Sequence, residues 1–267
     1  MAPAADDPGQ RAEDETRALL DERRFRDAVG PAAEACRLRP DSAAAWWHQG
    51  VVQKHVGQWR ACLDACDRAI ALAPDDSAGP RWNAGIAATA LGDWPRARAA
   101  WRAYGIDVPP GEGPLTMKLG VVCVRVAPSE RAEVVWCARF DPCRARVLSV
   151  PQPASGRRFG DIVLHDGERR GSRALDGRDV PVFDELMVLE SSSYRTWIVD
   201  VICADPAALA ALVARFDDVD GTIEDWTDSL QVLCAACSLG TPHAHDPDDE
   251  PGGEGGDGAA WQPARQL

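Results

Sequence analysis

The chain has 267 residues, of which 27% are charged, and a formal net charge of −13. Each of the segments 1–110, 111–245 and 246–267 is net negative. Nucleic acids and anionic membrane surfaces are bound through Lys and Arg side chains that neutralise phosphates, so this charge argues against both classes of partner. The start of the chain is acidic, and no apolar run is long enough to span a membrane, which predicts a cytoplasmic protein. The nine cysteines are an odd number with no visible pattern of disulfide pairs, so their thiols are expected to be reduced.

A pattern of Trp, Gly, Gly, Trp and Pro recurs after 35 residues in the first half of the chain. The matched pairs are Trp47 and Trp82, Gly50 and Gly85, Gly57 and Gly92, Trp59 and Trp94, and Pro74 and Pro109. Such a period, with a Pro closing each unit, is typical of stacked helix-turn-helix repeats. Because Gly inside a helix costs about 1 kcal/mol relative to Ala, the first Gly of each unit indicates that two helices approach closely there. The second Gly suits a turn that needs positive φ.

A weaker copy lies 34 residues before the first unit, where Phe25, Ala28, Ala35 and Pro40 match Trp59, Cys62, Ala69 and Pro74. The sequence thus predicts three units over residues 11–109. Their helices are expected at about 11–22, 25–38, 42–56, 58–72, 78–91 and 93–105. This part resembles the tetratricopeptide repeat family, which implies an all-α array of helical hairpins with protein or peptide binding as its generic role.

In that family the first helix of each unit lines a concave groove. The resemblance places seven side chains on the groove wall: Trp47, Val51, Lys54, His55, Trp82, Ile86 and Thr89. Alternatively, the Trp residues fill the core or contact the second domain. Cys62 and Cys66 share a helix face, and we interpret them as small core residues rather than as half of a metal site.

The remainder is expected to form a linker at 110–115, an α+β domain at 116–245 and a flexible acidic tail at 246–267, while residues 1–10 form a disordered arm. Strands are predicted at 119–126, 133–140, 145–150, 160–167, 196–204 and 229–234. The segment 196–204 reads as a buried strand, and His165 as the end of one. A helix beginning at Pro206 and capped by Asp205 follows. The charged stretch 167–186 is predicted to be a solvated hairpin with surface ion pairs.

Two cysteines and two histidines near the end of this domain form the clearest chemical signal. Cys234 and Cys237 are followed by turn residues Gly240 and Pro242 and then by His243 and His245. Two thiolates and two imidazoles form a closed tetrahedral set suited to structural Zn²⁺. A redox Cys-x-x-Cys, a free-thiol core with surface His residues, and a catalytic metal site using three of these ligands plus water remain alternatives.

The sequence therefore predicts a multi-domain interaction protein, an adaptor or regulator, with a tetratricopeptide array and a zinc-stapled α+β domain. Its partner is expected to be a protein or peptide, and one form of the hypothesis has a basic partner held by the acidic surface. The alternative is a metal- or thiol-dependent enzyme in residues 116–245, assisted by Asp184 or Glu185, with the repeats recruiting a protein substrate.

Overall fold

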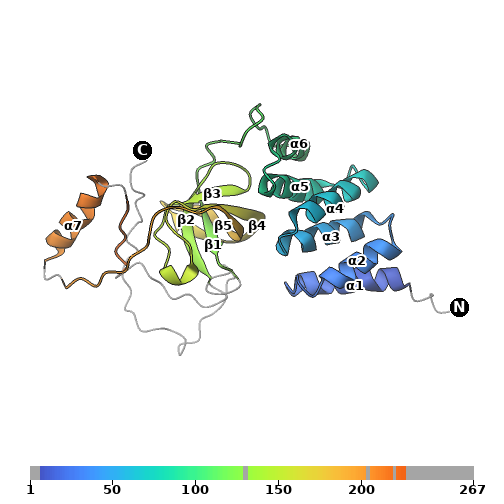
Figure 1. Cartoon of the computed structure of the whole chain (residues 1–267), viewed down its shortest axis with the longest axis horizontal. Coiled ribbons are helices and arrows are strands. Elements are labelled where there is room, and N and C mark those ends of the chain that lie inside the picture. The colour runs from blue at the N-terminus through green and yellow to red at the C-terminus, as the bar shows by residue number, and fades with distance from the viewer. Residues whose placement is uncertain (1–6, 129–131, 203–204, 219–220, 227–267) are drawn as a thin grey trace. The chain divides into compact units, whose positions relative to one another are not determined.

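The computed structural model of the chain describes residues 7–128, 132–202, 205–218 and 221–226. Internal contacts divide the chain into two compact units, Met1–Met117 and Lys118–Leu267. Among the described residues, the first unit contains helices and the second contains five strands followed by a helix (Figure 1). No helix within the described ranges is long and apolar enough to cross a membrane.

Three helical hairpins form the first unit, as the repeat pattern predicts. The helices are α1 (Pro8–Asp21), α2 (Val29–Leu38), α3 (Ala43–His55), α4 (Trp59–Leu72), α5 (Ala78–Ala90) and α6 (Trp94–Tyr104). Within each hairpin the two helices pack together, and α2 packs on α3 as α4 packs on α5, so that the hairpins stack in chain order. One predicted boundary is wrong, because residues 25–28 form turns and α2 begins only at Val29.

Short polar side chains and glycines set the ends of these helices. The Ser42 hydroxyl accepts a hydrogen bond from the backbone N–H of Ala45, and the Asp93 carboxylate accepts one from that of Arg96. These bonds satisfy N–H groups that have no partner within the helix. Gly57 and Gly92 connect the helices of the second and third hairpins with φ values of 74° and 69°, which confirms the predicted turns.

The glycines inside α3 and α5 mark close contacts between the helices of a hairpin. A Cβ atom on Gly50 would lie 2.9 Å from the Sγ atom of Cys66, and one on Gly85 would lie 2.6 Å from the Trp101 ring. Cys62, Cys66 and Trp101 are fully buried, so the two cysteines are core residues as predicted.

The second unit contains a closed five-stranded barrel. Its strands are β1 (Val121–Val126), β2 (Glu133–Arg139), β3 (Arg144–Val147), β4 (Ile162–Leu175) and β5 (Arg178–Glu190), with a short 3₁₀ helix, η1 (Pro153–Ser155), before β4. Neighbours along the chain pair antiparallel, and β5 closes the barrel by pairing parallel to β1. The helix α7 (Pro206–Ala214) and the 3₁₀ helix η2 (Arg215–Asp218) follow the barrel.

Alternation along the strands sorts side chains onto the two faces of the barrel wall. Val122, Val124 and Val126 of β1 belong to one apolar cluster, together with residues of the other four strands. Cys123 lies in a second cluster with Val182 and the half-buried Trp136. Because successive side chains of a strand point to opposite faces, both sides of β1 are covered.

Predictions for the second unit are confirmed in part. The hairpin in 167–186 is formed by β4 and β5 and turns at Asp176 and Gly177, and Asp205 caps α7 as expected. The prediction of a buried strand at 196–204 is wrong over the described residues 196–202, which pair with no strand and leave Trp197 76% exposed. The predicted strand 229–234 lies outside the described residues.

Candidate functional site

Trp47 on α3 is the most exposed of the seven predicted groove residues. Its side chain is 40% exposed, although a residue of this type buries a large apolar area in most proteins. The ring packs on the first turn of α5, where a Cβ atom on Gly79 would lie 2.9 Å from Trp47 Cζ2. The ring also neighbours that of His48, with 5.8 Å between the ring centroids. The indole is thus held in place while much of it stays accessible.

Lys54 and His55, at the end of the same helix, are engaged in packing. The Lys54 side chain is only 6% exposed, and its Nζ atom donates a hydrogen bond to Oδ1 of Asn83 on α5 at 3.2 Å. The His55 ring stacks on Phe25, with 3.8 Å between the centroids. Val51 is half-buried. The interaction between Lys54 and Asn83 ties the first helices of two successive hairpins together.

The three predicted groove residues on α5 are also occupied in packing. Trp82 makes edge-to-face contacts with Trp101 and Tyr104 of α6, at centroid distances of 5.0 and 4.9 Å. Ile86 and Thr89 are buried, and the Thr89 hydroxyl donates to the Gly85 carbonyl oxygen at 2.8 Å. Lys54, Ile86 and Thr89 are therefore not accessible to a partner in this structure, which leaves Trp47 as the main exposed feature of the set.

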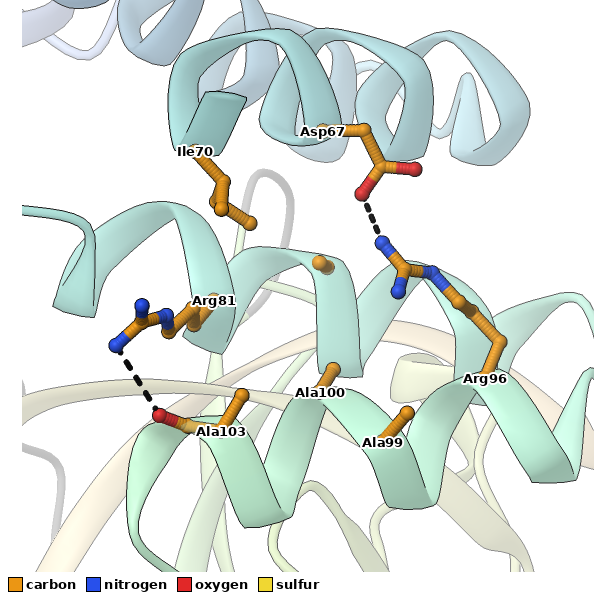
Figure 2. Close-up of a pocket in the computed structure, with 8 residues that line it drawn as sticks. Asp67, Ile70, Arg81, Arg96, Ala99, Ala100 and Ala103 are labelled. Carbon is orange, nitrogen blue, oxygen red and sulfur yellow. Dashed lines mark hydrogen bonds and ion pairs between the residues drawn. The ribbon is translucent and has the colours of Figure 1, made fainter. Parts of the chain in front are cut away.

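A pocket of about 190 Å³ lies between α4, α5 and α6 (Figure 2). Its lining is formed by Asp67 and Ile70 of α4, Arg81 and Ala84 of α5, and Arg96, Ala99, Ala100 and Ala103 of α6. An ion pair between Asp67 and Arg96 bridges α4 and α6 at one end of the pocket. Arg81 lies at the other end, as Figure 2 shows, and donates hydrogen bonds to backbone carbonyl oxygens.

The barrel contains buried charges that the sequence analysis placed in a solvated hairpin. Asp184 and Glu185 lie within β5 and are almost fully buried. Asp184 pairs with Arg125 of β1, with 2.6 Å between Nη2 and Oδ1, and Arg170 Nε lies 3.4 Å from its second oxygen. Glu185 accepts hydrogen bonds from Arg157 Nε at 2.7 Å and from the Ala127 backbone N–H at 2.9 Å. Both carboxylates therefore have structural partners, which weakens their candidacy as catalytic groups.

His165 is a buried residue whose environment the sequence analysis missed. It lies within β4, not at a strand end, and its ring stacks on Phe183 at a centroid distance of 4.9 Å. Its Nδ1 atom lies 2.7 Å from the Asp166 carbonyl oxygen, and Nε2 has no hydrogen-bond partner among the described residues. Burial, reinforced by the charge of Arg139, lowers the pKa of His165 from 6.5 to about 4. The ring is therefore neutral at pH 7.

The predicted metal ligands Cys234, Cys237, His243 and His245 all lie outside the described residues. Within the ranges that the structure describes, no group of three or more His, Cys, Asp or Glu side chains is arranged to hold a metal ion.

No protein-family model matches the chain, and neither does any curated protein. Among solved structures, the crystal structure of MamA protein aligns with 22% sequence identity and a TM-score of 0.35. The alignment covers 36% of this chain and 52% of the MamA chain, so this chain spans about half the length of that protein. A likeness of this size carries no argument about fold or function.

Proposed function

We propose that the chain is a protein-binding adaptor or regulator whose helical hairpins form a tetratricopeptide-like scaffold. The observation that carries this proposal is Trp47, a large aromatic side chain that is 40% exposed and yet fixed against Gly79 of the next hairpin. Rigid, accessible Trp side chains are common anchors of protein interfaces, because they bury much area on binding and lose little conformational freedom.

The stacking of the hairpins supports this role. Lys54 and Asn83 join α3 to α5, and the ring of Trp47 covers the start of α5, so that a partner would meet the first helices of two hairpins as one rigid surface. A pre-organised surface binds with less loss of entropy than a mobile one. The partner that we propose is a protein or peptide that inserts an apolar group beside Trp47.

Affinity capture with purified full-length protein tests this role. Trp47→Ala should abolish capture of the partner and leave the melting temperature nearly unchanged, because 40% of Trp47 is already exposed to solvent. Tyr104→Ala is the matched control, since Tyr104 is an aromatic residue of similar exposure, 42%, on α6. That variant should retain capture. A captured protein qualifies as the partner only if, once purified, it binds the wild type and Tyr104→Ala equally.

Two outcomes would contradict the proposal. One is full binding of the purified partner by Trp47→Ala. The other is a fall in stability of about 3 to 5 kcal/mol, the usual cost of truncating a buried Trp, which would identify Trp47 as a core residue.

The net charge of −13 supports a narrower form of the proposal, in which the partner is basic. Long-range attraction between opposite charges is screened by salt, with a Debye length of about 8 Å at physiological ionic strength. The association rate of a basic partner should therefore fall as salt is raised. A rate that is independent of salt would exclude the basic partner and leave the binding role of Trp47 intact.

A further inference from the structure

The pocket between α4, α5 and α6 has an apolar floor and is too small for a drug-sized ligand. Its volume of about 190 Å³ is below the roughly 300 to 1,000 Å³ of typical ligand pockets. The floor is lined by Ile70, Ala84 and Ala100, and the exposed residues Ala99 and Ala103 lie at the rim. It has the size and surface for one branched aliphatic side chain.

Comparison of two hairpins shows why the space is open. Ala103 of α6 matches Arg68 of α4 in the repeat of 35 residues. Arg68 extends back to the preceding hairpin, with its Nη2 atom 3.4 Å from the Pro40 carbonyl oxygen and 3.5 Å from Asp41 Oδ1. The methyl group of Ala103 cannot extend in that way. The replacement of a long side chain by a short one thus leaves room at the rim of the pocket.

Arg81 shows a second difference between the hairpins. It matches Trp46 in the repeat, and each of the two donates a hydrogen bond to the Pro carbonyl that closes the preceding hairpin. Trp46 Nε1 lies 2.9 Å from the Pro40 oxygen, and Arg81 Nη2 lies 2.8 Å from the Pro74 oxygen. Because a neutral indole makes the same bond in one hairpin, the bond does not need the positive charge that Arg81 brings to the other.

That charge is available to a ligand. The second hydrogen bond of Arg81 also goes to an uncharged acceptor, the Ala103 carbonyl oxygen at 3.2 Å from Nη1, and no carboxylate of the described residues pairs with Arg81. A guanidinium has about five N–H donors, so these two bonds leave others for an anion. The other cation of the pocket, Arg96, is neutralised by Asp67. The uncompensated charge of the pocket is therefore that of Arg81 (Figure 2).

We propose that this pocket binds an aliphatic side chain and a neighbouring carboxylate of a protein partner. The aliphatic group, the size of Leu, Ile or Val, occupies the alanine floor, and the carboxylate of an adjacent acidic residue accepts hydrogen bonds from Arg81. The proposal for this pocket rests on the proposed function in one respect, which is that the ligand belongs to a protein partner. Trp47 is not among the residues that line the pocket.

The test uses the full-length chain and the peptide acetyl-Ala-Leu-Asp-Ala-amide, with methyl resonances of Ala84 and Ala100 as the readout in NMR titrations. Saturable shifts are expected, and the Asn counterpart, acetyl-Ala-Leu-Asn-Ala-amide, should bind about tenfold more weakly because it lacks the charge-assisted bond. Arg81→Gln should abolish this difference between the peptides. Trp47→Ala should leave it unchanged, which separates this site from the surface around Trp47.

Arg81 also donates hydrogen bonds to two backbone carbonyl oxygens, so Arg81→Gln could fail to fold. A second variant tests the proposal in that case. Ala103→Leu fills the rim from an exposed position and should eliminate the shifts caused by both peptides. The proposal is overturned if the Asp peptide gives no saturable shift, if the two peptides bind equally to the wild type, or if binding survives in folded Ala103→Leu.

Discussion

Arg23 and Gly57, which lie 34 residues apart, adopt the same left-handed backbone conformation, with φ values of 58° and 74°. Both follow the first helix of a hairpin, and Gly92 occupies the same place in the third hairpin with φ of 69°. The turn geometry is therefore repeated three times, although only two of the three positions carry the residue that adopts it without strain. A side chain with a Cβ atom pays about 1 to 2 kcal/mol there.

This relationship predicts opposite effects for two substitutions. Gly57→Ala should destabilise the helical unit by about 1 kcal/mol, whereas Arg23→Gly should stabilise it. The gain at Arg23 should be smaller than the loss at Gly57, because the guanidinium lies 5.3 Å from the centroid of the Phe25 ring and that contact would be lost. Thermal melts followed by helical circular dichroism measure both. A loss of stability in Arg23→Gly would show that the Arg23 contacts outweigh the strain.

Glycines within the helices should respond according to the space around them. Gly85→Ala should be destabilising by about 1 to 3 kcal/mol, because the added Cβ atom would lie 2.6 Å from the buried Trp101 ring. Gly30 in α2 is the matched control, since a Cβ atom there would meet nothing within 4 Å. Gly30→Ala should change stability by much less than Gly85→Ala, because no neighbouring helix is displaced, while the usual gain of Ala over Gly is limited at a residue in the first turn that directly precedes Pro31. Equal effects at the two positions would show that α5 and α6 can separate to accept the methyl group.

The buried ion pair between Arg125 and Asp184 should be strongly coupled in a double-mutant cycle. Arg125→Met alone removes the cation that lies 2.6 Å from the buried Asp184 carboxylate, and such a loss typically costs about 3 to 5 kcal/mol. Adding Asp184→Leu should recover much of that cost, because the buried carboxylate that had lost its partner is then absent as well. Hydrogen exchange of the β1 and β5 amides measures the second unit by itself. Additive effects of the two substitutions would contradict the coupling.

The helical unit is predictable from the sequence because its signals are local. The turn glycines and the closing prolines each act within one hairpin, and the period of 35 residues shows where the next hairpin begins. All six helices lie within a few residues of their expected positions. The exception is the start of α2. The sequence gives no sign that residues 25–28 form turns, because the weak first copy was aligned by apolar matches such as Phe25 alone.

The second unit is less predictable because its pairings are distant in sequence. Short apolar runs located the first strands, but nothing local shows that β5 closes a barrel against β1 or that Asp184 meets Arg125 across 59 residues. The charged composition of 167–186 suggested solvation, whereas ion pairs with Arg125 of β1 and with Arg157 allow Asp184 and Glu185 to be buried. Residues 196–202 have the composition of a strand, but a strand also needs a neighbouring strand to pair with, and composition alone does not show whether one is present.

The buried imidazole of His165 predicts a loss of stability at mildly acid pH. Burial lowers the pKa of His165 in the folded state from 6.5 to about 4. Below about pH 6.5 the imidazole is therefore protonated in the unfolded state, whereas in the folded state it stays neutral until about pH 4. The stability contributed by the neutral ring is fully present above pH 6.5 and is lost as pH falls through that window. At about 1.4 kcal/mol per pH unit, the total loss is roughly 3 kcal/mol.

Comparison with a variant isolates this effect, because burial also shifts the pKa values of other groups. Burial lowers the pKa of His48 and raises those of Glu133 and Glu224. These residues therefore also contribute to the change of the free energy of unfolding with pH. His165→Phe keeps a ring next to Phe183 and does not titrate. The difference in barrel stability between wild type and variant, measured by hydrogen exchange, should shrink or reverse between pH 6.5 and pH 4. A difference that is constant with pH would contradict the lowered pKa.

The last prediction concerns Cys234, Cys237, His243 and His245, whose spacing suits Zn²⁺. Protein purified without chelators should contain about one zinc ion per chain, with two sulfur ligands at about 2.3 Å and two nitrogen ligands at about 2.0 to 2.1 Å by X-ray absorption. Because thiolates and neutral imidazoles are the ligating forms, affinity should fall as pH is lowered. Cys234→Ser should reduce the metal content, whereas His55→Gln, in the helical unit, should not. Metal-free protein, or full zinc content in a Cys237→Ser, His243→Ala variant, would exclude this ligand set and favour the redox or free-thiol alternatives.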